Sequence, residues 1–149
     1  MIQRIQTVYL LLSVIIMIAL NWMPIAYFEE INFYTYGISS TIANASLYIT
    51  TFPIAVIVIA STILAAISIF MYKNRVKQAK IVALSIFLDV MFYPTFIAYL
   101  WYSKEALMNI DNSFSFALII PAISIILKSL AAKAIKADEK LVRSADRIR

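Results

Sequence analysis

The 149-residue sequence contains no cysteine and no histidine. Without cysteine, disulfides, thiol redox chemistry and thiolate metal sites are excluded. Without histidine, the chain has neither a histidine-ligated haem nor a histidine general base, two common routes to chemistry in a helical membrane protein. We therefore expect no metal site and no cofactor, and we assign no catalytic residue.

Charged residues are also scarce, at 14%, whereas hydrophobic residues make up 63% of the chain. Soluble domains have about 25% charged and about 45–50% apolar residues. A chain of this size cannot hide so much apolar surface in one core. We therefore expect lipid to surround it. The net charge of +5 does not indicate a nucleic-acid partner, because the basic residues flank apolar segments.

Four apolar segments, at about residues 5–28, 48–72, 81–102 and 114–130, each approach the roughly 20 residues that cross a bilayer. They are apolar on all sides, which favours helices over transmembrane strands. The predicted fold is an all-α polytopic membrane protein, a single membrane domain over residues 1–149 with four transmembrane helices in an up-down bundle.

Loop 29–47 has β-branched and aromatic residues before Gly37, the only glycine in the sequence. This composition predicts a short hairpin or an extended lid.

The distribution of basic residues predicts the orientation. Twelve of the thirteen Lys and Arg residues would lie on one side: Arg4, four between residues 73 and 80, and seven from Lys128 onward. Only Lys104 would lie on the other side. The positive-inside rule places the twelve, and with them both termini, in the cytoplasm.

The tail, residues 131–149, predicts a cytoplasmic amphipathic helix that continues out of the membrane. A narrow apolar stripe runs along it, formed by Ile135, Leu141, Val142, Ala145 and Ile148. Its basic residues Arg143, Arg147 and Arg149 are candidates for contact with a partner or with anionic lipid. A solvated extension of the last helix explains the same pattern equally well.

Asp89 is the single acid inside an apolar segment. A charge there costs about 2.5–3.5 kcal/mol on insertion scales, so it should face the interior and have a partner. Ser85 and Tyr93 lie on the same helical face, at i−4 and i+4. Partners at a matching depth are Tyr9, Ser13 and, if its side chain turns inward, Lys128. We favour a hydrogen-bonded Asp that fastens helices together over a proton or cation relay, which usually needs several ionisable groups.

Two prolines and a set of small residues bear on helix packing. Pro94 and Pro121 lack an N–H, so we expect the carbonyls of Val90 and Ala117 to lose their helical hydrogen bonds. Freed carbonyls can bind ions, but proline kinks also occur in transmembrane helices that have no transport role. We favour ordinary kinks. The second segment has a small face for close approach within the monomer or in a homo-oligomer. That face consists of Ala60, Ser61, Ala65, Ala66 and Ser68.

The opening MIQRIQTVYLLL and the closing DEKLVRSADRIR resemble the two ends of an uncharacterised bacterial family of small four-helix inner-membrane proteins, a domain of unknown function. The resemblance implies the same topology and an inner-membrane location. It also suggests a Gram-negative source, in which loop 29–47 would be periplasmic. It carries over no activity and no site residue.

On function, we expect a non-enzymatic accessory, scaffold or interaction protein that contacts a membrane-protein partner or forms a homo-oligomer. The alternative is a small proton- or cation-coupled transporter or channel that uses Asp89. Four-helix drug exporters work as dimers around a membrane carboxylate, but theirs is a Glu in the first helix. A membrane enzyme ranks last, because it would usually need paired carboxylates, histidine or a metal cluster.

Overall fold

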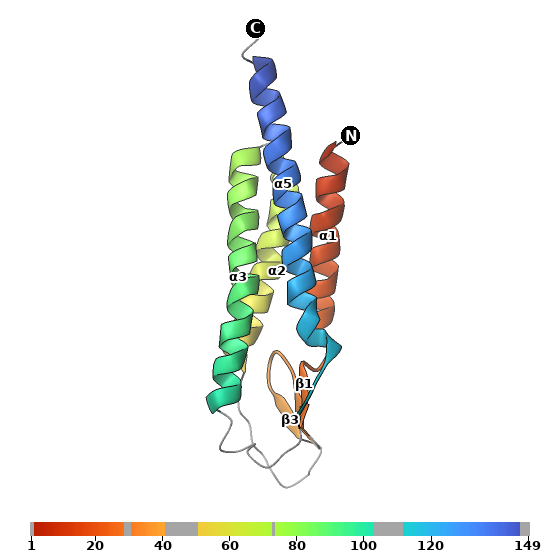
Figure 1. Cartoon of the computed structure of the whole chain (residues 1–149), viewed down its shortest axis with the longest axis vertical. Coiled ribbons are helices and arrows are strands. Elements are labelled where there is room, and N and C mark those ends of the chain that lie inside the picture. Colours follow the sequence, from red (N-terminus) through yellow and green to blue (C-terminus); the bar gives the residue numbers. More distant parts are fainter. Residues whose placement is uncertain (1, 29–30, 41–50, 73, 103–111, 147–149) are drawn as a thin grey trace.

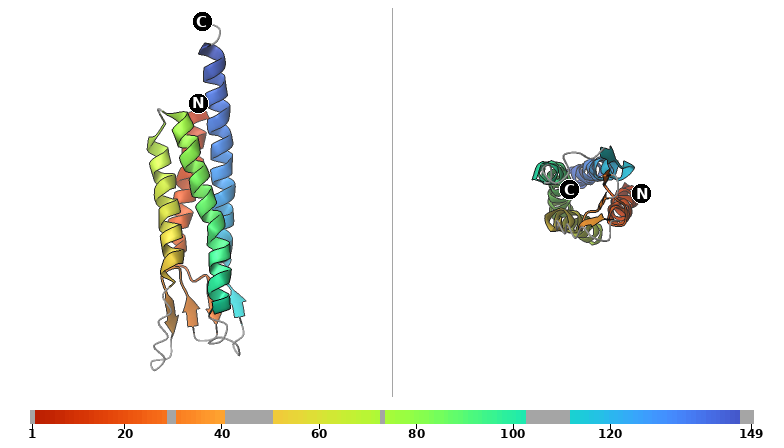
Figure 2. Two further views of the ribbon diagram at one scale, coloured as in Figure 1. Left: turned by 90° about the vertical axis from the view of Figure 1, so that its left-hand side faces the viewer. Right: turned by 90° about the horizontal axis from the view of Figure 1, so that it is seen from below.

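The computed structural model describes residues 2–28, 31–40, 51–72, 74–102 and 112–146, and most of them are helical. The four long helices are α1 (Ile2–Leu20), α2 (Phe52–Phe70), α3 (Arg75–Tyr102) and α5 (Ile120–Asp146). They pack side by side, with α1 against α2 and α5, and α3 against α2 and α5 (Figure 2). Both ends of the chain and the α2–α3 turn lie at one end, here called the basic end (Figure 1). The predicted all-α class is confirmed, with one small sheet added at the opposite end.

Burial in each helix repeats at alternating steps of three and four residues, as it does in a left-handed coiled coil. In α3 the buried positions are Gln78, Val82, Ser85, Asp89, Phe92 and Phe96. In α5 they are Pro121, Ser124, Lys128, Ala131 and Ile135. α1 and α2 follow the same pattern, and Ser61, Ala65 and Ser68 form the buried part of the small face predicted for α2. Each helix therefore contributes one narrow row of buried side chains to the interior.

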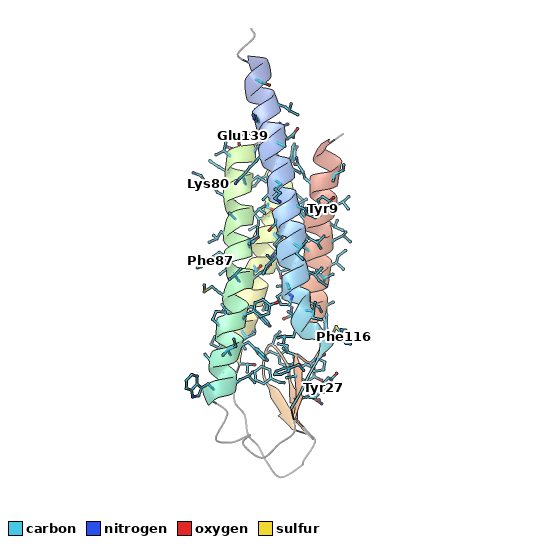
Figure 3. All side chains as sticks on the ribbon, in the orientation of Figure 1. Tyr9, Tyr27, Lys80, Phe87, Phe116 and Glu139 are labelled. Atoms are coloured by element: carbon cyan, nitrogen blue, oxygen red, sulfur yellow. The ribbon has the colours of Figure 1, made fainter. Side chains whose placement is uncertain are left out.

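The outward faces of the helices are apolar. Phe87 on α3 points away from the other helices and is 54% exposed (Figure 3), and Ile63 on α2 is 52% exposed. Within the described part of the chain, three helical stretches are long and apolar enough to cross a bilayer: Phe52–Phe70, Arg75–Trp101 and Phe116–Val142. The apolar stretch of α1, Ile5–Leu20, is shorter. An apolar exterior around an interior that contains buried polar and charged side chains differs from the arrangement in soluble proteins.

The first predicted segment, residues 5–28, was too long at its C-terminal end. α1 ends at Leu20, and Ala26–Phe28 forms a strand, β1. The N–H of Asn21 bonds to Ile18 O at 3.1 Å, which tightens the last turn. Pro24 then prevents the helix from continuing, because it lacks an N–H and disfavours helical backbone at the residue before it.

The other helix boundaries also differ from those predicted. α2 lies inside the predicted segment 48–72, of which residues 48–50 are outside the described residues. α3 begins at Arg75, not at residue 81, and Asn74 Oδ1 accepts a hydrogen bond from Lys77 N at 3.2 Å, which caps its first turn. α5 begins at Ile120, not at residue 114, and continues past residue 130 to Asp146. The predicted continuation of the tail as a helix is thus confirmed as far as Asp146, and residues 147–149 lie outside the described residues.

The sheet contains four antiparallel strands in the order β3-β2-β1-β4, where β2 is Ile31–Phe33, β3 is Ile38–Ser40 and β4 is Asn112–Phe114. β2 and β3 form the hairpin that was one alternative for this loop, closed by Tyr34 N to Gly37 O at 2.9 Å. β4 was missed and leads through a short 3₁₀ helix, η1 (Phe116–Ile119), into α5.

The sheet has one apolar face, and this face packs on the helices. Phe33 is fully buried and meets Phe96 of α3 edge to face, with ring centroids 5.6 Å apart. Thr51, just before α2, fixes the hairpin turn, because its hydroxyl donates to Tyr34 O and Thr35 O, both at 3.1 Å. The sheet therefore closes the end of the helical part opposite the two termini (Figure 1).

Candidate functional site

Two apolar clusters fill the interior, one on each side of a polar layer. The sheet-end cluster includes Met17, Val58 and Phe92, and the basic-end cluster includes Leu10 and Val82. Between them lie four buried polar side chains, which we call the central polar cluster. Its members, each with zero exposure, are Ser61 of α2, Asp89 of α3, and Ser124 and Lys128 of α5.

Every member of the central polar cluster bonds to another member. Lys128 Nζ lies 2.7 Å from Asp89 Oδ2 and donates a second hydrogen bond, also 2.7 Å, to Ser61 Oγ. Ser124 Oγ donates to Asp89 Oδ2 at 2.8 Å, and Ser61 Oγ bonds to Asp89 Oδ1. Both carboxylate oxygens are therefore satisfied, and opposite charges meet in an environment where an unpaired charge is costly.

Helical spacing explains why these residues meet. Ser124 and Lys128 are four residues apart on α5, so both project from the same face. Asp89 is the fifteenth of the 28 residues of α3, near its middle. Ser61 lies near the middle of α2 and reaches α3 twice, since its hydroxyl is also 3.1 Å from Ser85 O. The cluster thus joins three helices at mid-height.

Of the predicted partners of Asp89, the structure brings only Lys128 to its carboxylate. Ser85 contributes its backbone carbonyl to Ser61, while its own hydroxyl donates to Val82 O at 2.8 Å. Tyr93 instead donates to Leu118 O at 3.3 Å, which links α3 to η1. The remaining two partners were placed wrongly: the hydroxyl of Ser13 donates to Leu10 O, and Tyr9 packs against the basic-end cluster.

The roles of Ser61 and Ser124 were missed by sequence reasoning. Ser61 was predicted only as part of a small packing face, although it bonds to both charged residues. Ser124 was not singled out. Its position one turn before Lys128 on a helix was the available signal, because i and i+4 side chains share a face.

The prediction for Pro121 was wrong. The carbonyl of Ala117 is not free, since it accepts a hydrogen bond from the backbone N–H of Ile120. Pro121 lies in the first turn of α5, where a helix tolerates proline because the N–H would have no helical partner. Pro94 lies inside α3 as expected, and the hydroxyl of the neighbouring Thr95 donates to Met91 O at 2.8 Å.

The central polar cluster contains the two groups of a serine–lysine catalytic pair, Ser61 and Lys128. In such enzymes the lysine accepts the serine proton. Here Lys128 donates to Ser61 and is held by Asp89, and all three side chains have zero exposure. Among the described residues, no group of three or more acidic side chains could hold a metal ion. The bonds of this arrangement join α2, α3 and α5.

A second ionic contact joins α3 to α5 near the basic end. Arg75 lies 3.2 Å from Asp138 Oδ2 and also donates to Asp138 O at 3.0 Å. Of the three arginines predicted as a contact surface, Arg143 lies on α5 without a described side chain. Arg147 and Arg149 lie outside the described residues.

Comparison with known proteins agrees with the resemblance seen in the two ends of the chain. A search of curated proteins gives no match. The model of a protein family, the domain of unknown function DUF4293, matches residues 2–148, which is nearly the whole chain. On that coverage, the protein belongs to the DUF4293 family.

Proposed function

We propose that the four helices cross the bacterial inner membrane as a bundle, with both termini in the cytoplasm. The described helical exterior offers lipid an apolar surface, whereas serine, glutamine, Asp89 and Lys128 face inward. α2 has 19 residues and is therefore about 28 Å long. That length fits a hydrocarbon core of about 30 Å.

Residues typical of a membrane interface support this placement at both ends. Exposed aromatic side chains surround the sheet end: Trp22, Phe52, Trp101 and Phe116. Exposed lysines surround the basic end: Lys77, Lys80, Lys133 and Lys136. Aromatic residues favour the headgroup level, and positive residues favour the cytoplasmic side. The sheet would then face the periplasm.

Within this membrane, we infer that the protein is a non-enzymatic scaffold that presents a cytoplasmic helix to another component. One observation carries the inference: α5 runs unbroken from Ile120, past the buried Lys128, to Asp146. Its last turns project beyond the other three helices in both side views (Figures 1 and 2). We call residues 133–146, which end in these projecting turns, the α5 extension. The Asp89–Lys128 pair holds α5 in the bundle at mid-height.

Site-specific photocrosslinking in the native host tests this proposal. A photoreactive amino acid in place of Ala137, an exposed position on the α5 extension, should give one reproducible protein adduct. The same amino acid in place of Ile63 or Phe87, on lipid-facing surfaces, should give none of that size. If the extension gives no protein adduct while the chain is present at its normal level, the proposal is wrong.

The second candidate function is transport of protons or cations through the bundle. The observation in its favour is the buried Asp89, because an ionisable residue in mid-membrane is by default a functional hypothesis. It ranks second because Lys128 and two serines already occupy both carboxylate oxygens. We expect purified protein in proteoliposomes to give no proton or cation flux above that of empty vesicles. A flux that Asp89→Asn abolishes would reverse the ranking.

A further inference from the structure

On the α5 extension, acidic and basic side chains lie on different sides of the helix. Asp138 is turned toward α3, where it pairs with Arg75. The exposed positions carry three lysines with no described acid among them: Lys133, Lys136 and Lys140. Glu139, three residues after Lys136, is half-buried, so the most exposed positions form a basic face directed away from the bundle.

One large apolar side chain accompanies these lysines, because Leu141 is 57% exposed. Val142 is 46% exposed but lies on the side of the buried Ile135, seven residues earlier. Leu141 lies one turn beyond the exposed Ala137, so the two form a short apolar stripe along the helix. Lys140 lies beside this stripe, and Lys136 lies four residues before Lys140. The face has the composition of a helix that pairs with another helix: an apolar stripe with charged flanks.

Because of the direction of α5, this stripe lies away from the lipid. Leu141 lies eight residues beyond Lys133, so it is about 12 Å further along the helix axis. Each headgroup layer is only about 5–8 Å thick. Because α5 continues along the long axis of the molecule (Figure 2), the stripe would stand in water beyond the headgroups. A membrane surface cannot cover it without a bend in α5.

We infer that the α5 extension docks an amphipathic helix of another protein, one whose apolar stripe is flanked by Asp and Glu. This inference rests on the proposed scaffold function and adds the chemistry of the partner. Ala137 and Leu141 pack on the partner's apolar stripe. Lys136 and Lys140 face its carboxylates, which steers the encounter and disfavours basic partners.

The test uses the full-length protein in its host, with the photoreactive amino acid at Ala137. Lys136→Glu/Lys140→Glu should reduce the adduct by about tenfold or more, because like charges then face each other. The matched control, Lys77→Glu/Lys80→Glu, makes the same charge change at the same end of the molecule, on α3, and should leave the adduct within about twofold. Leu141→Ser should also weaken the adduct. The crosslinked peptide, mapped by mass spectrometry, should be an acidic amphipathic segment.

Three results would overturn the inference while leaving the scaffold function in place. They are an adduct that persists in Lys136→Glu/Lys140→Glu, an adduct lost equally in the α3 control, and a crosslinked peptide without flanking acids. A peptide from a second copy of this chain would replace the acidic partner with a homo-oligomer. Labelling of lipid alone, without a protein adduct, would overturn both the inference and the proposed function.

Discussion

Lys128→Met is expected to destabilise the protein by about 3–5 kcal/mol, the usual cost of removing one partner from a buried ion pair. Methionine fills much of the space of the lysine side chain, so the loss reports charge more than volume. Asp89 would keep its hydrogen bonds to the two serines but lose its countercharge. The measurement is unfolding in mild detergent by titration with SDS, followed by helical circular dichroism.

Two further variants separate the ion pair from a general effect of the substitution. Lys133→Met makes the same chemical change at an exposed position of the same helix and should change the unfolding free energy by about 0.5 kcal/mol or less. Asp89→Leu/Lys128→Met removes both charges and should recover most of the stability lost in the single variant. If the double variant is less stable than Lys128→Met, the pair is not the source of the loss.

The existence of this pair could be predicted from the sequence, but its full composition could not. The cost of a charge in lipid required a partner for Asp89, and only a few polar residues lay at a suitable depth. Which of these polar residues reaches Asp89 depends on which helices pack against α3. α3 packs against α5 and α2, so Lys128 and Ser61 reach the carboxylate. Hydropathy gives the depth of a residue, not the neighbours of its helix.

The sheet shows a different limit of sequence reasoning. Its strands have three residues each, too few for periodicity to distinguish them from helix ends. Ala26–Phe28 is apolar and was therefore counted with the first helix, although Pro24 was a signal for its end. β4 pairs with β1 across more than eighty residues of sequence, a contact that no local pattern encodes.

Phe33→Ala should also have a large effect, a loss of about 3–5 kcal/mol, as is typical when a buried aromatic residue is truncated. Phe33 has zero exposure and is the sheet residue that meets the ring of Phe96. Its loss leaves a cavity between the sheet and the sheet-end cluster. Unfolding by SDS measures the loss. Tyr27→Ala, on the neighbouring strand at a half-exposed position, is the control and should cost much less.

The two large effects should be additive, because Phe33 and Lys128 belong to different layers of the interior. Phe33 packs in the sheet-end cluster, whereas Lys128 bonds to Asp89 and Ser61 in the central polar cluster. Separated sites without shared partners usually add within about 0.3–0.5 kcal/mol. A clearly smaller loss in Phe33→Ala/Lys128→Met than the sum of the single variants would mean that the sheet and the ion pair open together. The sheet would then be coupled to the ion pair, and its role would extend beyond closing the end of the helices.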